Sequence, residues 1–176
     1  RQAPRLLDPA PTAEQREVLF AAALRAPDHG QLRPYRFLTV EGEARNQLGE
    51  ILAQAVQGQG GEVTQAALDK ARAMPLRAPL VVVVVARLQE HFKVPKSEQL
   101  ITAGCAAHAI ELAAFAQGIG AVWRTGELSY NAHVAKGLGL EDGEEVVAFL
   151  YLGTPQNDLR DAPKVNSAEF VKAWSA

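Results

Sequence analysis

The segment Leu80–Ala86 is apolar throughout and contains five consecutive valines. β-branched side chains favour strands, and a strand without polar alternation is covered on both of its faces. We therefore expect a central strand here. Val146–Leu152 has the same character and predicts a second core strand, and shorter strands are expected over Tyr35–Val40 and Ala121–Trp123.

The first helix is predicted from a capping pattern. Thr12 followed by Gln15 forms a capping box, and a stripe through Val18 and Ala22 continues until Ala26-Pro27 ends the helix. Arg25 falls on the same stripe. An arginine on a buried helical face needs an anionic or hydrogen-bonding partner, because an unpaired buried charge is very costly.

Four further helices follow from spacing. Glu43–Val56 and Glu62–Ala73 are separated by a glycine-rich turn, and Asn131–Leu138 forms a short helix. A long helix capped by Ser97 runs to Gln117 and is apolar on both faces. Small residues dominate it, namely Ala103, Gly104, Ala106, Ala107 and Ala109. Such a helix can approach its neighbours closely, and we expect it at the core of a homodimer.

Composition limits the classes of protein to consider. The 176 residues suit one domain, and no internal boundary interrupts residues 1–176. A net charge of −2 argues against nucleic acid and anionic membranes as partners. Cys105 is the single cysteine, which excludes an internal disulfide and a multi-cysteine zinc site. No signal peptide opens the chain, and His108 and Glu111 interrupt the apolar stretch Leu100–Phe115, so we expect a cytoplasmic protein.

Several familiar motifs are missing or weak. The strand Leu80–Ala86 is followed by Arg87-Leu88-Gln89-Glu90 rather than by a glycine fingerprint, which argues against a Rossmann dinucleotide site. Gly118-Ile119-Gly120 fits the end of a helix. Cys105 is expected to be an inert buried thiol. The histidines show no metal-ligand spacing, and His108 is expected in the core, on a seam with Ile101, Leu112 and Phe115.

Three loops concentrate arginine where a buried element begins or ends. They are Arg25–Tyr35, Trp123–Gly126 and the opening Arg1–Arg5. Arginine offers forked donors to phosphate and stacks on aromatic rings, so this set predicts a site for a phosphorylated, planar ligand. The alternative is that these arginines are solvated loop residues without a ligand.

The order of these segments resembles a known family. Five segments follow one another along the chain in this order: Arg1-Gln2, Ala26-Pro27-Asp28-His29, Pro34-Tyr35, Trp123-Arg124-Thr125-Gly126 and Phe149–Pro155. The combination resembles the nitroreductase superfamily of FMN-dependent NAD(P)H oxidoreductases, and within it the short, single-domain YdjA-like branch. The resemblance extends from Arg1 to Pro155. It implies an α+β fold, in which helices flank a mixed central sheet and FMN binds at the interface of a homodimer.

The resemblance also implies roles for individual residues. Arg1 and Gln2 take the ribityl-phosphate end of FMN, with Gln2 where the family commonly has serine. Arg25 and His29 reach the flavin from the second subunit. Trp123, Arg124 and Thr125 line the isoalloxazine. The nicotinamide dinucleotide contacts fall on Ala113, Ala114, Phe115, Ala116, Gln117 and Gly118. Neither a protein nucleophile nor a metal is implied.

The implied activity is hydride transfer from NADH or NADPH through FMN to an electron-poor acceptor, such as a nitroaromatic or a quinone. Two other functions remain open at this stage. One is a module that stores or senses flavin without turnover. The other is a dimeric interaction protein without a cofactor. The visible spectrum and the oxidation of NAD(P)H separate the three.

Overall fold

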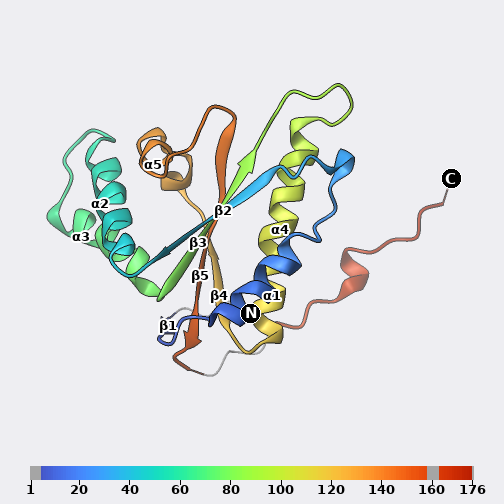
Figure 1. The fold of residues 1–176 in the computed structure, drawn as a ribbon, viewed down its shortest axis with the longest axis horizontal. Helices are drawn as coiled ribbons and strands as arrows, with labels where there is room; N and C mark the ends of the chain where they lie inside the picture. Colours follow the sequence, from blue (N-terminus) through green and yellow to red (C-terminus); the bar gives the residue numbers. More distant parts are fainter. Residues whose placement is uncertain (1–4, 158–162, 176) are drawn as a thin grey trace.

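The computed structural model describes residues 5–157 and 163–175, which form an α+β fold around one sheet (Figure 1). The strands are β1 (Leu6–Leu7), β2 (Tyr35–Glu41), β3 (Leu80–Arg87), β4 (Gly120–Arg124) and β5 (Glu144–Pro155). β3 pairs with β2 and β5, while β4 and β1 also pair with β5. All four ladders between the described strands are antiparallel. The expectation of a mixed sheet is therefore wrong for these strands.

Both faces of β3 are covered, as its sequence predicts. Residues Leu80–Ala86 are all 0% exposed. Val81, Val83 and Val85 face the helices α2 (Ala44–Gln57), α3 (Gln65–Ala73) and α5 (Ala132–Gly137). The alternate side chains, from Leu80 to Ala86, face α1 (Ala13–Ala23) and α4 (Lys96–Ala116) on the other side (Figure 1). The successive side chains of a strand point to opposite faces, so one run of residues contributes to two cores.

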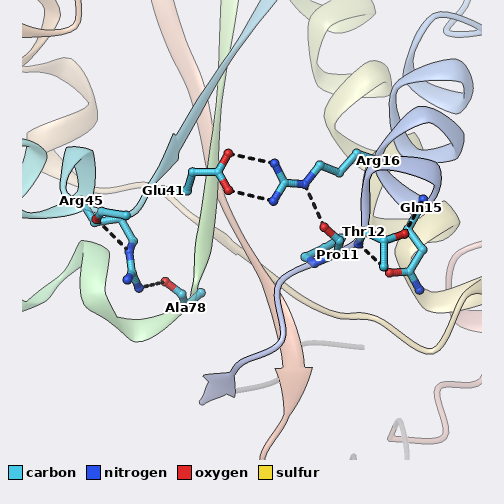
Figure 2. Close-up of polar contacts among 8 residues, drawn as sticks. Pro11, Thr12, Gln15, Arg16, Glu41, Arg45 and Ala78 are labelled. Atoms are coloured by element: carbon cyan, nitrogen blue, oxygen red, sulfur yellow. Dashed lines mark hydrogen bonds and ion pairs between the residues drawn. The ribbon is translucent and has the colours of Figure 1, made fainter.

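The capping box of α1 is confirmed, and it lies beside an ion pair that ties α1 to the sheet. The Thr12 backbone N–H donates to Gln15 Oε1 at 2.9 Å, and the Gln15 backbone N–H donates to Thr12 Oγ1 at 3.2 Å. Arg16 donates two hydrogen bonds to Glu41 at the end of β2, at 2.9 and 2.8 Å (Figure 2). Arg45 at the start of α2 donates to the Ala78 carbonyl at 2.9 Å. These contacts fix the first turn of α1 to β2 and the first turn of α2 to the segment that precedes β3.

The buried stripe of α1 differs from the expected one. Leu19 and Ala23 are 1% and 0% exposed, whereas Val18 is 50% exposed. α1 packs on α4 through the Leu19/Ala23 stripe. Each residue of this stripe directly follows the corresponding residue of the predicted Val18/Ala22 stripe. Arg25 follows the end of the helix and is exposed, so the prediction of an arginine on a buried face of this protomer is wrong.

Two helix starts also differ. α4 begins at Lys96 after an extended Pro95, so Ser97 lies in its first turn and is not the cap. α3 begins at Gln65 rather than Glu62, because the Thr64 hydroxyl accepts the Ala67 backbone N–H at 3.3 Å and so caps the helix there.

α4 has a buried face and an open one. Ala103, Ala106, Ala107, Ile110 and Ala114 are 0% exposed and face the sheet. The opposite face carries the open α4 stripe, which we define as Ile101, Cys105, His108, Leu112 and Phe115. His108 is therefore exposed rather than in the core, and Cys105 is only partly buried. Among the described residues α4 is also the one helix long and apolar enough to cross a membrane, a test that core helices pass as well.

The last part of the chain lies away from the sheet. After β5, residues 163–175 extend past α4 with a single turn of 3-10 helix, η4 (Ser167–Glu169) (Figure 1). Val165, Phe170, Val171 and Trp174 on this segment are 65–88% exposed. The segment therefore presents apolar side chains that no described part of the protomer covers.

Candidate functional site

The segment that leaves β4 is the first part of the candidate site. Trp123 points to the α1/α4 face and is partly buried there, and Arg124 and Thr125 are exposed. Gly126 follows with φ +140° and ψ −176°, and it leads into the 3-10 helix η3 (Glu127–Tyr130). A side chain is disfavoured at this φ, so glycine lets the chain turn from β4 into η3, which contacts α2.

An apolar pocket of about 290 Å³ lies beside this turn. Arg124, Thr125, Gly126 and Glu127 form its polar edge. Its remaining lining comes from α2, the end of α3, η3 and β5, and consists of Leu52, Val56, Gln59, Met74, Leu128, Ser129, Phe149 and Tyr151. A mostly apolar cavity with a few polar groups at one edge suits a planar organic ring.

Tyr151 is a buried titratable group that lines this pocket. Its side chain lies on β5 and is 8% exposed. Burial raises the pKa of the Tyr151 phenol, although the positive charges of Arg77 and Arg124 act in the opposite direction. The phenol therefore stays protonated at neutral pH and can donate a hydrogen bond.

Arg25 and His29 lie on a second loop, which connects α1 to β2. A shallow pocket of about 400 Å³ is lined there by Leu24, Arg25, Ala26, Asp28, Gln31, Arg33 and Tyr35. The Asp28 carboxylate accepts the backbone N–H groups of Leu32 at 3.1 Å and Arg33 at 2.7 Å. Gln31 and Arg33 have φ of +53° and +48°, so these two bonds hold a strained turn in place.

His29 begins the 3-10 turn η1 (His29–Gln31) on this loop. Its Nδ1 lies 2.6 Å from Oε2 of Glu98 in the first turn of α4. The Arg25 guanidinium makes no hydrogen bond or ion pair with residues 5–157 or 163–175 in this protomer.

The two groups of predicted residues are not brought together within one protomer. Arg25 and His29 lie beside α1 and α4, on one face of the sheet. The pocket next to Arg124 and Thr125 is lined by residues of α2 and β5 that belong to the opposite face of the sheet. The pocket beside Arg124 and the pocket beside Arg25 share no lining residue.

The segment Ala113–Gly118 forms the end of α4. Only Ala114 is fully buried, while Phe115, Ala116 and Gly118 are exposed. Gly118 follows the C-cap Gln117 with φ +71°, which confirms that this glycine segment ends a helix. The segment Ala113–Gly118 precedes β4, and Thr125 follows β4. The length of this strand, ~16 Å at about 3.3 Å per residue, therefore separates the segment from Thr125.

Some residues of the site lie outside the sequence prediction or outside the described structure. Arg1 and Gln2 lie outside the described residues. Leu52, Val56 and Met74 were not predicted, because an apolar pair spaced i, i+4 on a helix signals a core as readily as a pocket. Glu98 was missed as well, since its partner His29 is distant in sequence. Across the described ranges, no group of three or more His, Cys, Asp or Glu side chains could hold a metal ion.

Comparison with known proteins identifies the family. The model of the "Nitroreductase family" matches residues 5–154. The chain belongs to the nitroreductase family. This nitroreductase is 45% identical over 156 residues to the Escherichia coli K12 protein named "Putative NAD(P)H nitroreductase YdjA", covering 89% of this chain and 84% of that protein. The match confirms the resemblance to the YdjA-like branch and makes the protein an oxidoreductase.

Solved structures agree with the fold. A nitroreductase-like protein from Bacillus cereus superposes with a TM-score of 0.84 at 21% identity, covering 100% of this chain and 92% of that one. An FMN-dependent nitroreductase from Clostridium difficile superposes with a TM-score of 0.71 at 18% identity, covering 98% and 94%. The nitroreductase fold is thus confirmed for this chain.

Proposed function

We propose that this nitroreductase binds FMN and transfers hydride from NADH or NADPH to a small electron-poor acceptor, of the nitroaromatic or quinone type. The observation that carries the proposal is the apolar pocket of about 290 Å³ whose edge is formed by Arg124, Thr125 and Gly126. The relatives support it, because they include a protein named "Putative NAD(P)H nitroreductase YdjA" and a structural neighbour described as an FMN-dependent nitroreductase. Such an enzyme works in the cytoplasm, where NAD(P)H is available.

The residues around the pocket fit an isoalloxazine. Phe149 and Tyr151 offer apolar surface to a ring, and Arg124 places a positive charge at the edge. The backbone N–H groups of Thr125 and Gly126 are donors suited to ring heteroatoms. Bound FMN would supply the two-electron chemistry that links NAD(P)H to the acceptor. The protein then only has to bind the ring, orient it and favour negative charge on it.

The proposed active form is a homodimer. The open α4 stripe is apolar except for His108, and Ile101, Leu112 and Phe115 in it are 53–64% exposed. A second copy seated on this stripe would cover it. In the proposed dimer, Arg25 and His29 contact the flavin from the second subunit. The exposed apolar side chains of residues 163–175 would find cover on the same partner.

Two further assignments belong to this proposal. Arg1 and Gln2 bind the phosphate end of FMN, because arginine offers forked donors to phosphate. Ala113, Ala114, Phe115, Ala116, Gln117 and Gly118 contact the nicotinamide dinucleotide.

Titration of the purified protein with FMN tests the proposal. We expect a yellow protein, or one that becomes yellow, whose melting temperature rises with FMN, because a ligand that binds only the folded state stabilises it. We also expect steady oxidation of NADH or NADPH when an acceptor is present. Binding without oxidation would favour a flavin store or sensor. No thermal shift at saturating FMN would contradict the flavin assignment and favour an interaction protein.

A further inference from the structure

The contact between His29 and Glu98 joins a predicted cofactor residue to a residue without an assigned role. Nδ1 of His29 lies 2.6 Å from Oε2 of Glu98. The two residues are 69 positions apart in sequence and lie on different elements, the η1 turn and the first turn of α4. Their side chains are 42% and 47% exposed, so the imidazole remains open to a ligand on its other side.

The backbone around His29 is held in place by the same face of α4. The Thr102 hydroxyl, one turn after Glu98, donates to the Pro27 carbonyl at 2.8 Å. A Cβ added to Gly30 would come within 3.3 Å of the Val94 side chain, so the turn lies close against the segment that precedes α4. The loop is thus anchored at Pro27 and packed at Gly30, and Glu98 acts on the ring between them.

The chemistry of the pair determines which nitrogen faces outward. An ionised carboxylate only accepts hydrogen bonds, so the proton of this contact lies on Nδ1 of His29. Nε2 is then the nitrogen left for a ligand, and the ring plane is fixed by the contact on Nδ1.

We propose that Glu98 is a positioning residue of the cofactor site, which binds Nδ1 of His29 and thereby presents Nε2 to the flavin. The inference rests on the proposed flavin function. It adds to that function the group, Glu98, that orients His29 toward the flavin site of the second subunit. Glu98 touches no cofactor itself and acts through His29 alone.

A double-mutant cycle on the full-length protein tests this inference. FMN affinity is measured by quenching of flavin fluorescence for Glu98→Ala, His29→Ala and the double variant. We expect each single change to weaken FMN on the order of 10-fold, as the loss of a group that orients a histidine does elsewhere. The double variant should bind no more weakly than His29→Ala. Glu98→Gln, which keeps an acceptor oxygen, should recover part of the affinity.

Glu90→Ala is the matched control, because Glu90 pairs with Lys96 at the start of α4 and has no contact with His29. It should leave FMN affinity unchanged. Nitrogen-15 NMR of the imidazoles gives a readout that requires no flavin. His29 should be the Nδ1–H tautomer in the wild type and should lose that preference in Glu98→Ala.

The outcomes separate this inference from the function on which it rests. Wild-type protein that binds no FMN would overturn both. Wild-type protein that binds FMN while Glu98→Ala binds it equally well would overturn the positioning role alone. Additive losses in the double variant, or an Nε2–H tautomer of His29 in the wild type, would also overturn that role alone.

Discussion

Arg36 and Glu144 join two strands that are not neighbours. Arg36 on β2 donates to both carboxylate oxygens of Glu144 at the start of β5, at 2.7 and 2.6 Å, across the end of β3 between them. The Glu144 side chain is 6% exposed and also lies 3.5 Å from Arg87. The hydrogen bonds from Arg36 lower the pKa of Glu144 below its ordinary value of 4.5, despite partial burial.

Glu144→Gln should therefore destabilise the fold and reduce its pH dependence. Loss of a charged hydrogen bond costs roughly 1.5–3 kcal/mol. Because the folded pKa of Glu144 is lowered, its contribution is present above the ordinary value of 4.5 and disappears as the pH falls through the lowered value. Urea unfolding should show the difference from wild type at neutral pH and a smaller one in acid. Glu145→Gln, an exposed neighbour, should show neither effect.

The dimer prediction is tested on the two faces of α4. Leu112 is 56% exposed on the open α4 stripe, whereas Ala107 is 0% exposed and faces the protomer's own sheet. Leu112→Glu should give a folded monomer with weak FMN retention, because a charge opposes burial in an interface. Ala107→Glu should unfold the protein, since an unpaired charge in a core costs several kcal/mol. Light scattering and circular dichroism separate these results, and a Leu112→Glu dimer would contradict the interface.

Arg25→Ala should weaken FMN without changing stability. Its guanidinium has no hydrogen bond or ion pair to the described residues, so its removal breaks no polar contact among them. A lost charged hydrogen bond to the flavin is worth about 10- to 100-fold in affinity. Arg45→Ala removes a bond to the Ala78 carbonyl and should do the reverse, lowering the melting temperature at constant FMN affinity. Unchanged FMN affinity in Arg25→Ala would contradict its cofactor role.

Arg124 is expected to tune the bound flavin. Its positive charge at the edge of the pocket favours the anionic reduced form, so Arg124→Gln should lower the midpoint potential. A loss of 1.4 kcal/mol corresponds to about 30 mV for a two-electron couple. Spectroelectrochemical titration measures the shift, and Arg124→Lys, which keeps the charge, should restore most of it. Equal flavin midpoint potentials in the wild type and Arg124→Gln would contradict this prediction, because they would show that the Arg124 charge does not act on the ring.

Patterns that depend on neighbouring residues were predicted correctly. The runs Leu80–Ala86 and Val146–Leu152 form core strands, and Thr12 caps α1 through Gln15. The order of short motifs from Arg1 to Pro155 was sufficient to indicate the family, which the match over residues 5–154 confirms. Such features depend on strand propensity, capping and motif order, and these are properties of the sequence itself.

The orientation of helices was predicted less well. α4 is apolar on both sides, so its composition cannot distinguish the face toward the sheet from the face left open. His108 was placed in the core for this reason, and Val18 was assigned to the buried stripe of α1 in place of Leu19. Which stripe is buried depends on how α1 and α4 pack on each other and on the sheet, and a single helix does not contain that information.

The sequence by itself determined the strands β2, β3, β4 and β5 but not β1, and it determined most helices, the family and the loops that carry arginine. Only the tertiary structure decided that Arg25 and His29 lie on the opposite face of the sheet from the pocket beside Arg124, and that Glu98 meets His29. The physical reason is the range of the interactions. Propensity, capping and turn chemistry act over a few residues, whereas a pocket or a side-chain pair 69 positions apart exists only after the chain has packed.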